Sequence, residues 1–209
     1  MNTMTLYTNP QSRGRVVRWM LEEVGQPYSV EVMEFGGSIK SPEYLKLNPM
    51  GKVPTLTHKG AVITETVAIC TYLAEQFPDS GLAPALDSPA RASYYRWLFF
   101  AAGPFEMATS AKAYKWPIDD ECAVAIGCGH IEDAINTLEK TLTAQPYLCG
   151  DSFTTADLVM SSYLGWEMMM KNIDPRPAFT AYVERCEGRE AARRANRLDD
   201  ALMEESAVS

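Results

Sequence analysis

Residues 47–57 read Leu-Asn-Pro-Met-Gly-Lys-Val-Pro-Thr-Leu-Thr, and residues 63–69 read Ile-Thr-Glu-Thr-Val-Ala-Ile. Between these segments, His58-Lys59-Gly60 has the composition of a tight turn, so we expect a short strand on each side of it. The second strand is expected to lead into a helix that opens at Glu65-Thr66. The stretch therefore predicts an X-Pro joint, a β-hairpin and a helix, in that order.

The X-Pro joint and the helix start both offer groups that suit one kind of ligand. An X-Pro peptide adopts the cis form at small cost and Pro54 has no backbone N–H, so Val53 is able to turn its own N–H and C=O toward an extended peptide. The first N–H groups of a helix are unpaired and lie at the positive end of its dipole, which attracts a carboxylate. Together these elements predict a pocket for a small anionic peptide, and the alternative is an ordinary hairpin that leads into a helix.

The residues before this stretch predict a strand, a helix, a second strand and a short helix. Residues 3–8 form the first strand, and a turn at 9–12 leads into a helix that Gly25 ends. An alternating strand at 28–32 and a short helix at 42–47 complete the order βαβαββα, which is the thioredoxin-like arrangement of a mixed sheet with helices on both faces. Apolar residues recur at helical spacing in the first helix: Val16, Val17, Met20, Leu21 and Val24.

A proline-rich segment divides the chain into two predicted domains. Residues 77–89 carry three prolines and a glycine, which favours a boundary there. We therefore expect an α/β domain at 1–79, a linker at 80–89 and an all-helical domain at 90–209. The expected helices of the second domain are a long one at 90–115 that is broken or kinked at Gly103-Pro104, one at 119–143, one that begins near Thr154, and two shorter ones from Pro177 on.

Two pairs of residues with helical spacing are expected to have structural roles only. Thr154 and Asp157 form a variant of the helix-capping box, with aspartate in place of the usual Glu or Gln. Such a cap contributes about 1 kcal/mol to the stability of a helix. On the first helix, Arg18 and Glu22 lie four residues apart and are expected to form an ion pair.

The composition is that of a globular protein and excludes several kinds of function. Of 209 residues, 46% are hydrophobic, and 19 basic against 27 acidic residues give a net charge of −8. That balance argues against a nucleic-acid binder, which needs a basic face. Neither a signal sequence nor an apolar run of membrane-spanning length is visible, so we expect a cytoplasmic location and no membrane partner. Five scattered cysteines and two histidines lack metal-ligand spacing, so no metal is expected.

The Val53-Pro54 joint followed by Glu65-Thr66, within a βαβαββα domain that precedes a helical one, resembles the cytosolic glutathione S-transferase superfamily. In this family a Val-Pro joint and a Glu-Ser or Glu-Thr pair hold glutathione, the tripeptide co-substrate. The resemblance covers nearly the whole chain and includes the capping box. It implies the fold and glutathione binding, and the short chain is compatible with a bacterial source.

Glutathione conjugation requires a group that stabilises the thiolate. A free thiol with a pKa near 8.5 is little ionised at neutral pH, and lowering that pKa by about two units takes roughly 2.7 kcal/mol. A hydroxyl near the end of the first strand is a suitable source, and three are present at Tyr7, Thr8 and Ser12. The segment Leu-Tyr-x-x-Pro-x-Ser resembles the serine-type classes, which implies that Ser12 activates the thiol. The alternative is Tyr7, with Ser12 only capping the helix.

The resemblance implies a role for each residue of the tripeptide site. Val53, before Pro54, is expected to bond the cysteinyl backbone through its main chain. Glu65 is expected to accept from the γ-glutamyl ammonium, and Thr66 to donate to the γ-glutamyl carboxylate. Three basic residues are expected near the anionic parts of glutathione: Lys52 and Lys40 at the glycyl carboxylate, and Arg13 beside the thiol.

The implied activity is that of a glutathione transferase, in which the thiolate attacks an electrophilic carbon of a hydrophobic substrate. The helical domain is expected to line the electrophile pocket, and the family implies a homodimer. Two alternatives stay open, namely a glutathione-dependent peroxidase or isomerase on the same site, and a non-catalytic glutathione-binding or scaffold protein. The candidates for the electrophile pocket are Phe100, Met107, Tyr114 and Trp166.

Overall fold

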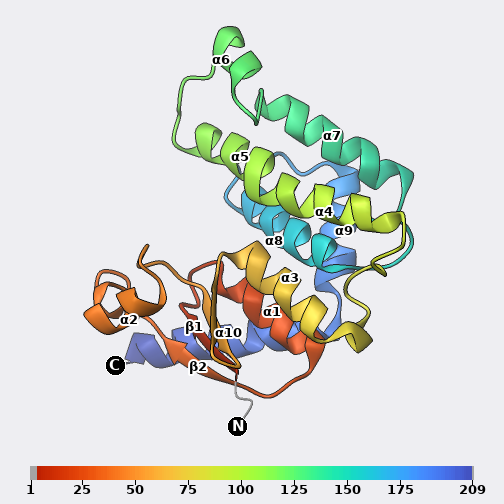
Figure 1. Ribbon diagram of the computed structural model, residues 1–209. Coiled ribbons are helices and arrows are strands. Elements are labelled where there is room, and N and C mark those ends of the chain that lie inside the picture. Colours follow the sequence, from red (N-terminus) through yellow and green to blue (C-terminus); the bar gives the residue numbers. More distant parts are fainter. Residues whose placement is uncertain (1–3, 209) are drawn as a thin grey trace. The chain divides into compact units, whose positions relative to one another are not determined.

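The computed structural model describes the backbone of residues 4–208 and the side chains of residues 4–204. The chain forms two compact units: the first combines the chain up to Ser80 with the segment from Arg189 on, and the second is Gly81–Gly188. The first unit is therefore built from both ends of the chain (Figure 1). Thr3, where the first strand was predicted to begin, lies outside the described residues.

The first unit contains a four-stranded mixed sheet with the strand order β2-β1-β3-β4. Its strands are β1 (Met4–Thr8), β2 (Tyr28–Val32), β3 (Thr55–His58) and β4 (Ala61–Thr64). β1 runs parallel to β2 and antiparallel to β3, so Leu6 pairs with Val30 on one side and with Leu56 on the other. Lys59 and Gly60 join β3 to β4 with φ values of 51° and 80°, as a two-residue type I′ turn requires. The predicted sheet and hairpin are confirmed.

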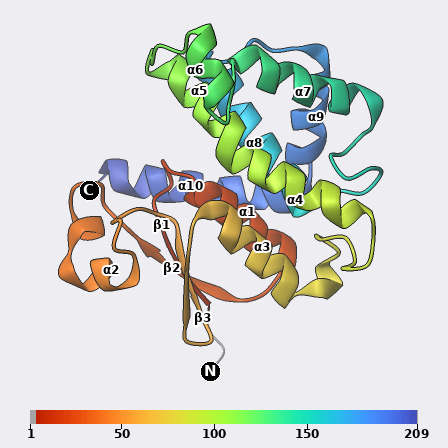
Figure 2. The ribbon, with the colours of Figure 1, turned by 45° about the horizontal axis from the view of Figure 1, so that its top comes forward.

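Helices cover both faces of this sheet. The helices of this part of the unit are α1 (Gly14–Val24), α2 (Pro42–Leu47) and α3 (Thr66–Gln76), with short 3-10 turns at η1 (Ser38–Lys40) and η2 (Pro78–Ser80). α1 and α3 lie side by side on the face of Leu6 and Thr8 (Figures 1 and 2). Tyr7 points to the opposite face because side chains alternate along a strand, and its ring lies 5.8 Å from that of Tyr44 in α2. The predicted order βαβαββα is confirmed.

The helix ends in this unit follow local signals in the sequence. Gly25 ends α1 with a φ of 66°, and its N–H donates to Leu21 O at 3.0 Å. Ser41 caps α2, because its hydroxyl accepts from the N–H of Tyr44 at 3.2 Å. The predicted apolar residues of α1 are all buried, which confirms the face that was expected to pack: Val16, Val17, Met20, Leu21 and Val24.

The C-terminal helix α10 (Glu190–Val208) packs against α1 in the first unit (Figure 2). The sequence had assigned residues 90–209 to one helical domain, whereas the segment from Arg189 on groups with the α/β unit. Arg18 is buried and bonds Asp199 of α10 at 2.7 Å, so its expected pairing with Glu22 was wrong. Glu22 instead accepts from Arg194 at 2.6 Å. Periodicity within α1 could not reveal a partner that arrives from the far end of the chain.

The second unit is helical throughout its secondary structure, apart from a single β-bridge between Tyr147 and Gly150. The predicted long helix at 90–115 is interrupted by five residues of π-helix that contain Gly103 and Pro104. Proline lacks an N–H and its ring clashes with the carbonyl four residues back, so a wider turn relieves the conflict. The predicted interruption of the helix at Gly103-Pro104 is confirmed. The helices are α4 (Ala90–Phe100), the π-helical η3 (Ala101–Phe105), α5 (Glu106–Ala113), α6 (Asp120–Ala125), α7 (Ile131–Ala144), α8 (Thr155–Met169) and α9 (Pro177–Glu187).

The single helix predicted at 119–143 is two helices. Asp119 starts α6 by accepting from the N–H of Cys122 at 2.8 Å, and α7 begins only after His130. The break contains Gly127 and Gly129, and Gly129 has a φ of 60°, which a helix does not allow. The apolar spacing correctly predicted a helix over the residues of α7, but the predicted start at residue 119 was wrong, and the two glycines were the signal that α7 begins after them.

Candidate active site

A cavity of about 290 Å³ in the first unit brings together most of the residues expected to hold the tripeptide. It opens where the turn before α1, the η1 segment and the joint before β3 meet. Five residues from the sequence prediction line it, and three others were not predicted. The predicted ones are Ser12, Arg13, Lys40, Lys52 and Val53, and the others are Phe35, Ile39 and Gly51.

The turn at residues 9–14 holds the Ser12 hydroxyl in a defined position. Ser12 Oγ donates to Asn9 O at 2.7 Å and accepts from the N–H of Gly14 at 2.9 Å. Asn9 anchors the turn, because its amide nitrogen donates to Met33 O at 2.8 Å and its amide oxygen accepts from the N–H of Gln11 at 2.9 Å. Arg13 is the N-cap residue of α1, and Ser12 Oγ, which lines the cavity, bonds the N–H of Gly14, the first residue of this helix.

The two other hydroxyl candidates lie on opposite faces of β1. Thr8 is fully buried, and among the described residues its Oγ1 has no hydrogen-bond partner. A Cβ on Gly14 would lie 1.8 Å from this atom and 3.0 Å from Ser12 Oγ, so glycine is required where α1 meets the strand. Tyr7 packs on the other face in a small core cluster that also contains Tyr44 and Val53. Neither Thr8 nor Tyr7 lines the cavity.

The Val53–Pro54 peptide bond is cis, the form that an X-Pro peptide adopts at small cost. The ladder of β3 begins at Thr55, which pairs with Thr64 of β4 and Tyr7 of β1. Val53 thus lies just outside the registered part of the sheet while it lines the cavity.

Two side chains that the sequence analysis missed hold this joint in place. Tyr44 Oη donates to Lys52 O at 2.5 Å and lies 2.9 Å from Thr55 Oγ1. Asn48 Nδ2 donates to Lys52 O at 2.8 Å, and Asn48 Oδ1 accepts from the N–H of Met50 at 3.1 Å. Burial raises the pKa of Tyr44, so its phenol stays a donor. The Asn-Pro-Met-Gly sequence at 48–51 is typical of a turn, and this was the signal in the sequence that could have drawn attention to Asn48.

Lys40 is fixed at the floor of the cavity by main-chain carbonyls. Its Nζ donates to Met50 O at 3.1 Å and to Gly51 O at 3.2 Å. Gly51 has a φ of 59°, and a Cβ there would lie 2.8 Å from Ile39 O. Lys40 therefore brings a positive charge to the cavity on a side chain that is already ordered.

Replacing Gly51 by alanine is expected to lower the free energy of unfolding by about 2 kcal/mol, because left-handed strain and a clash with Ile39 O act together. Gly60→Ala is the matched control: Gly60 also has a positive φ, but nothing lies within 4 Å of its added Cβ. It is expected to cost only about 1 kcal/mol. Urea denaturation measures the free energy of unfolding of both variants. Equal losses would show that the close approach to Ile39 is unimportant.

Glu65 and Thr66 lie at the start of α3 and are not among the residues that line this cavity. Glu65 has a φ of 67°, a conformation that costs a non-glycine residue about 1–3 kcal/mol and is concentrated at functional sites. Thr66 is the first residue of the helix and is buried. The pair thus lies in the turn between β4 and α3, where the first N–H groups of a helix have no partner within the helix.

The four candidates for the electrophile pocket belong to the second unit. Met107 and Tyr114 are exposed, and they lie two helical turns apart, hence on one side of the helix. Trp166 on α8 is also exposed. Phe100 is partly buried against a core cluster that includes Ala108, and its ring lies 5.1 Å from that of Trp97. Three of the four side chains are therefore open to a ligand.

The described residues contain no group of three or more His, Cys, Asp or Glu side chains that could hold a metal ion. All five cysteines are free, and Cys70, Cys128 and Cys186 are buried. Burial raises the pKa of the Cys70 thiol well above its ordinary value, so this thiol is unreactive. None of the helices within residues 4–208 combines the length and the apolar character needed to cross a membrane.

A thioredoxin-like unit with a cavity at its cis-proline joint, followed by a helical unit, defines the class of protein. Residues 2–75 match the family Glutathione S-transferase, N-terminal domain, and residues 104–190 match Glutathione S-transferase, C-terminal domain. Glutathione S-transferase 1 of Dianthus caryophyllus is 31% identical over 165 residues, which cover 74% of this chain and 74% of the relative. The chain belongs to the cytosolic glutathione S-transferase superfamily.

Solved structures give the same assignment. A glutathione transferase from Methylococcus capsulatus str. Bath matches with a TM-score of 0.78 at 30% identity, covering 95% of this chain and 99% of that one. A sphingomonad glutathione S-transferase, solved in complex with glutathione, matches with a TM-score of 0.74 at 27% identity, covering 94% of this chain and 98% of that one. The similarity therefore extends over both units.

Proposed function

We propose that this transferase conjugates the thiolate of glutathione to hydrophobic electrophiles, with Ser12 as the residue that stabilises the thiolate. The observation that carries the proposal is the cavity at the cis-proline joint, because it gathers Ser12, Val53 and two lysines around one space of tripeptide size. In the reaction the sulfur forms a bond to the electrophilic carbon, and the leaving group departs with its electron pair. The thiol proton is released to solvent beforehand.

The charges of the site match those of glutathione. Lys40 and Lys52 bind the glycyl carboxylate, and Lys40 keeps one donor for it after bonding the carbonyls of Met50 and Gly51. Val53 pairs through its main chain with the cysteinyl residue. Glu65 accepts from the γ-glutamyl ammonium, and Thr66 with the first amides of α3 binds the γ-glutamyl carboxylate.

Ser12 has a donor that it can redirect to sulfur. Its hydroxyl now donates to Asn9 O while its oxygen accepts from the N–H of Gly14. Rotation about the C–O bond turns the hydrogen toward a thiolate without loss of the bond from Gly14. Arg13, which also lines the cavity, adds positive charge near the sulfur.

We assign the electrophile to the apolar side chains of the second unit, namely Phe100, Met107, Tyr114 and Trp166. Met168 and Met169 at the end of α8 add adaptable apolar surface. We further propose a cytoplasmic homodimer, and sedimentation velocity tests its stoichiometry. Analysis of the product distinguishes conjugation from its alternatives, since a thioether marks a transferase, oxidised glutathione a peroxidase and a rearranged substrate an isomerase.

Ser12→Ala is expected to slow conjugation about fivefold at pH 6.5. Loss of the donor raises the thiol pKa by about two units, from about 6.5 to about 8.5, which lowers the thiolate fraction at this pH about 50-fold, while the more basic thiolate regains about tenfold in nucleophilicity. The pH at which the rate is half-maximal should rise by about two units. Conjugation rates measured across pH 5.5–9.5 give both the slowing and the shift of the pH profile, and a glutathione titration shows whether the variant still binds glutathione.

Two controls distinguish activation of the thiol from capping of the helix. Ser12→Thr keeps the hydroxyl and should retain the pH profile. Thr8→Val removes the neighbouring buried hydroxyl, which does not line the cavity, and should also leave the profile in place. If Ser12→Ala leaves both rate and profile unchanged while glutathione still binds, the role passes to Tyr7 or to backbone donors.

A further inference from the structure

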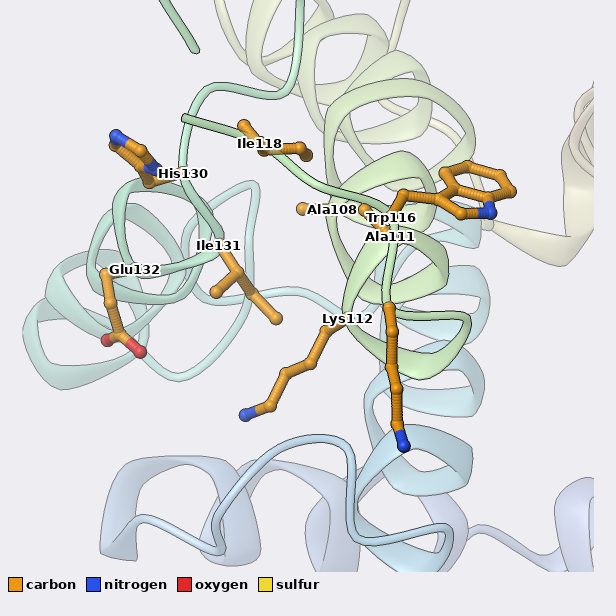
Figure 3. A pocket seen from close by; sticks show the side chains of 9 residues that line it. Ala108, Ala111, Lys112, Trp116, Ile118, His130, Ile131 and Glu132 are labelled. Atoms are coloured by element: carbon orange, nitrogen blue, oxygen red, sulfur yellow. The ribbon is translucent and has the colours of Figure 1, made fainter. Parts of the chain in front are cut away.

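The second unit contains a larger cavity than the one at the cis-proline joint, of about 590 Å³. Figure 3 shows Ile131 of α7 and Lys112 of α5 extending into the space between these helices. The residues assigned to glutathione and to the electrophile do not line this space. Recognition of the tripeptide therefore depends on the smaller cavity, and on what holds the wall that Val53 contributes to it.

The carbonyl of Lys52, the residue before Val53, accepts two hydrogen bonds from side chains of the first unit. Tyr44 Oη donates to it at 2.5 Å, and Asn48 Nδ2 donates to it at 2.8 Å. Both side chains are buried, at 3% and 4% exposed, which limits their freedom to turn away from this acceptor. These two donors therefore set the direction of the Lys52 carbonyl.

The same peptide group carries the N–H of Val53. The cis bond of the joint follows Val53, and the peptide group between Lys52 and Val53 is trans. In a planar trans peptide the N–H points opposite to the C=O. Because the carbonyl points to the buried Tyr44 and Asn48, the N–H points away from them. In the part of the chain that the structure describes, this N–H forms no hydrogen bond, so it is a free donor on a residue that lines the cavity.

Thr55, on the other side of the proline, orients the Tyr44 phenol. Thr55 is fully buried, and its Oγ1 lies 2.9 Å from Tyr44 Oη and accepts from Asn48 Nδ2 at 3.3 Å. Since the phenol gives its one hydrogen to Lys52 O, the Thr55 hydroxyl donates to Tyr44 Oη. Hydrogen bonds in such a chain strengthen one another. The Tyr44 ring also belongs to the core cluster against which the Val53 side chain packs.

We propose that Tyr44 is a positioning residue for glutathione, whose hydroxyl holds the Lys52–Val53 peptide so that the Val53 N–H donates to the cysteinyl carbonyl of the tripeptide. The inference rests on the proposed function, because it names the donor that glutathione meets at the joint. Tyr44 does not line the cavity and acts through the main chain. It therefore governs the affinity for glutathione, whereas the ionisation of the thiol depends on Ser12.

Tyr44→Phe is expected to weaken the binding of glutathione about fivefold, because the Val53 N–H is no longer held in line with its acceptor. Isothermal titration calorimetry of the whole protein measures the Kd. With 1-chloro-2,4-dinitrobenzene as the electrophile, KM for glutathione should rise in parallel, while kcat stays within about twofold of wild type and the pH profile keeps its midpoint.

Two further variants make the result specific to the joint. Tyr28→Phe is the matched control, since it removes a phenol of the same unit that donates to Glu22 Oε1 at 2.6 Å, and it should leave the Kd for glutathione unchanged. Thr55→Val removes the hydroxyl that orients the Tyr44 phenol and should weaken glutathione about twofold. It also tests the proposal if urea denaturation shows that Tyr44→Phe does not fold.

A modified tripeptide distinguishes positioning of the N–H from general support of the site. Glutathione in which a trans alkene replaces the peptide bond between its cysteinyl and glycyl residues lacks the carbonyl that the Val53 N–H meets. Wild type and Tyr44→Phe should therefore bind this analogue with the same Kd. The proposal is overturned if Tyr44→Phe weakens both ligands equally, or if it binds glutathione as wild type does. A wild-type protein that binds neither ligand would overturn the proposed function as well.

Discussion

Replacing Asp157 by alanine is expected to lower the free energy of unfolding by about 4 kcal/mol. The carboxylate is fully buried and accepts four hydrogen bonds. Oδ1 accepts from the N–H of Leu148 at 2.7 Å and from Tyr182 Oη at 3.0 Å, while Oδ2 accepts from the N–H and the hydroxyl of Thr154, each at 2.9 Å. Alanine leaves these donors without an acceptor in a dry interior. Urea denaturation of the whole protein measures the loss.

The controls for this prediction lie in the same region of the second unit. Asp151→Ala changes an exposed carboxylate and should alter stability by no more than about 0.5 kcal/mol. Tyr182→Phe removes one of the four donors and should cost about 1 kcal/mol. If Asp157→Ala lowers the free energy of unfolding no more than Asp151→Ala does, the Asp157 carboxylate does not stabilise the packing of the 147–150 segment against α8.

The pH dependence of this site has a defined sign. Burial raises the pKa of Asp157 above its ordinary value, although its bonds from Leu148, Thr154 and Tyr182 act in the opposite direction. A raised folded-state pKa means that stability from this group is fully present below the unfolded pKa and is lost as the pH rises through the folded pKa. The stability difference between wild type and Asp157→Asn should therefore widen as the pH is lowered through that range, and urea midpoints at pH 7 and pH 4.5 test this.

Elements with local signals were predictable from the sequence. The helix at 42–47 begins with Pro42 directly after the cap Ser41, and α1 is followed by Gly25, so the bounds of both follow from residues within one turn. The hairpin followed from its turn, and the capping box from its spacing. In each case the physical cause lies within about four residues of the feature that it sets.

Features that depend on distant residues could not be predicted in this way. Arg18 pairs with Asp199, 181 residues further along the chain, and Tyr44 of α2 lies 2.9 Å from Thr55 of β3, a contact between two separate elements. Phe35 lies in a turn and Ile39 in the three-residue η1, and both line the cavity; segments this short have no hydrophobic period from which a buried face could be predicted. The candidate site residues could be proposed from the family resemblance and from the chemistry of their side chains. The residues that hold them in position are identified only by the contacts in the structure.

Arg18→Met is expected to lower the free energy of unfolding by about 3–5 kcal/mol, because it leaves the buried carboxylate of Asp199 without a counter-charge. The two side chains are 4% and 0% exposed and make one hydrogen bond of 2.7 Å. Among the described residues, Arg18 Nη2 and Asp199 Oδ2 have no hydrogen-bond partner. The pair is therefore an incompletely satisfied buried ion pair, whose desolvation cost is offset only in part.

That incomplete pairing makes the double variant Arg18→Met/Asp199→Leu the more informative protein. Removing both charges removes the unpaired atoms as well, so its stability should return to within about 1 kcal/mol of wild type or exceed it. The matched control is the pair of Arg15 and Asp200 on the same two helices, which lies at 2.8 Å but is 30% and 60% exposed. Arg15→Met should cost less than about 1 kcal/mol, since water screens that pair. Urea denaturation of all variants decides the matter: if the double variant remains as unstable as Arg18→Met, the ion pair itself is what fastens α10 to α1.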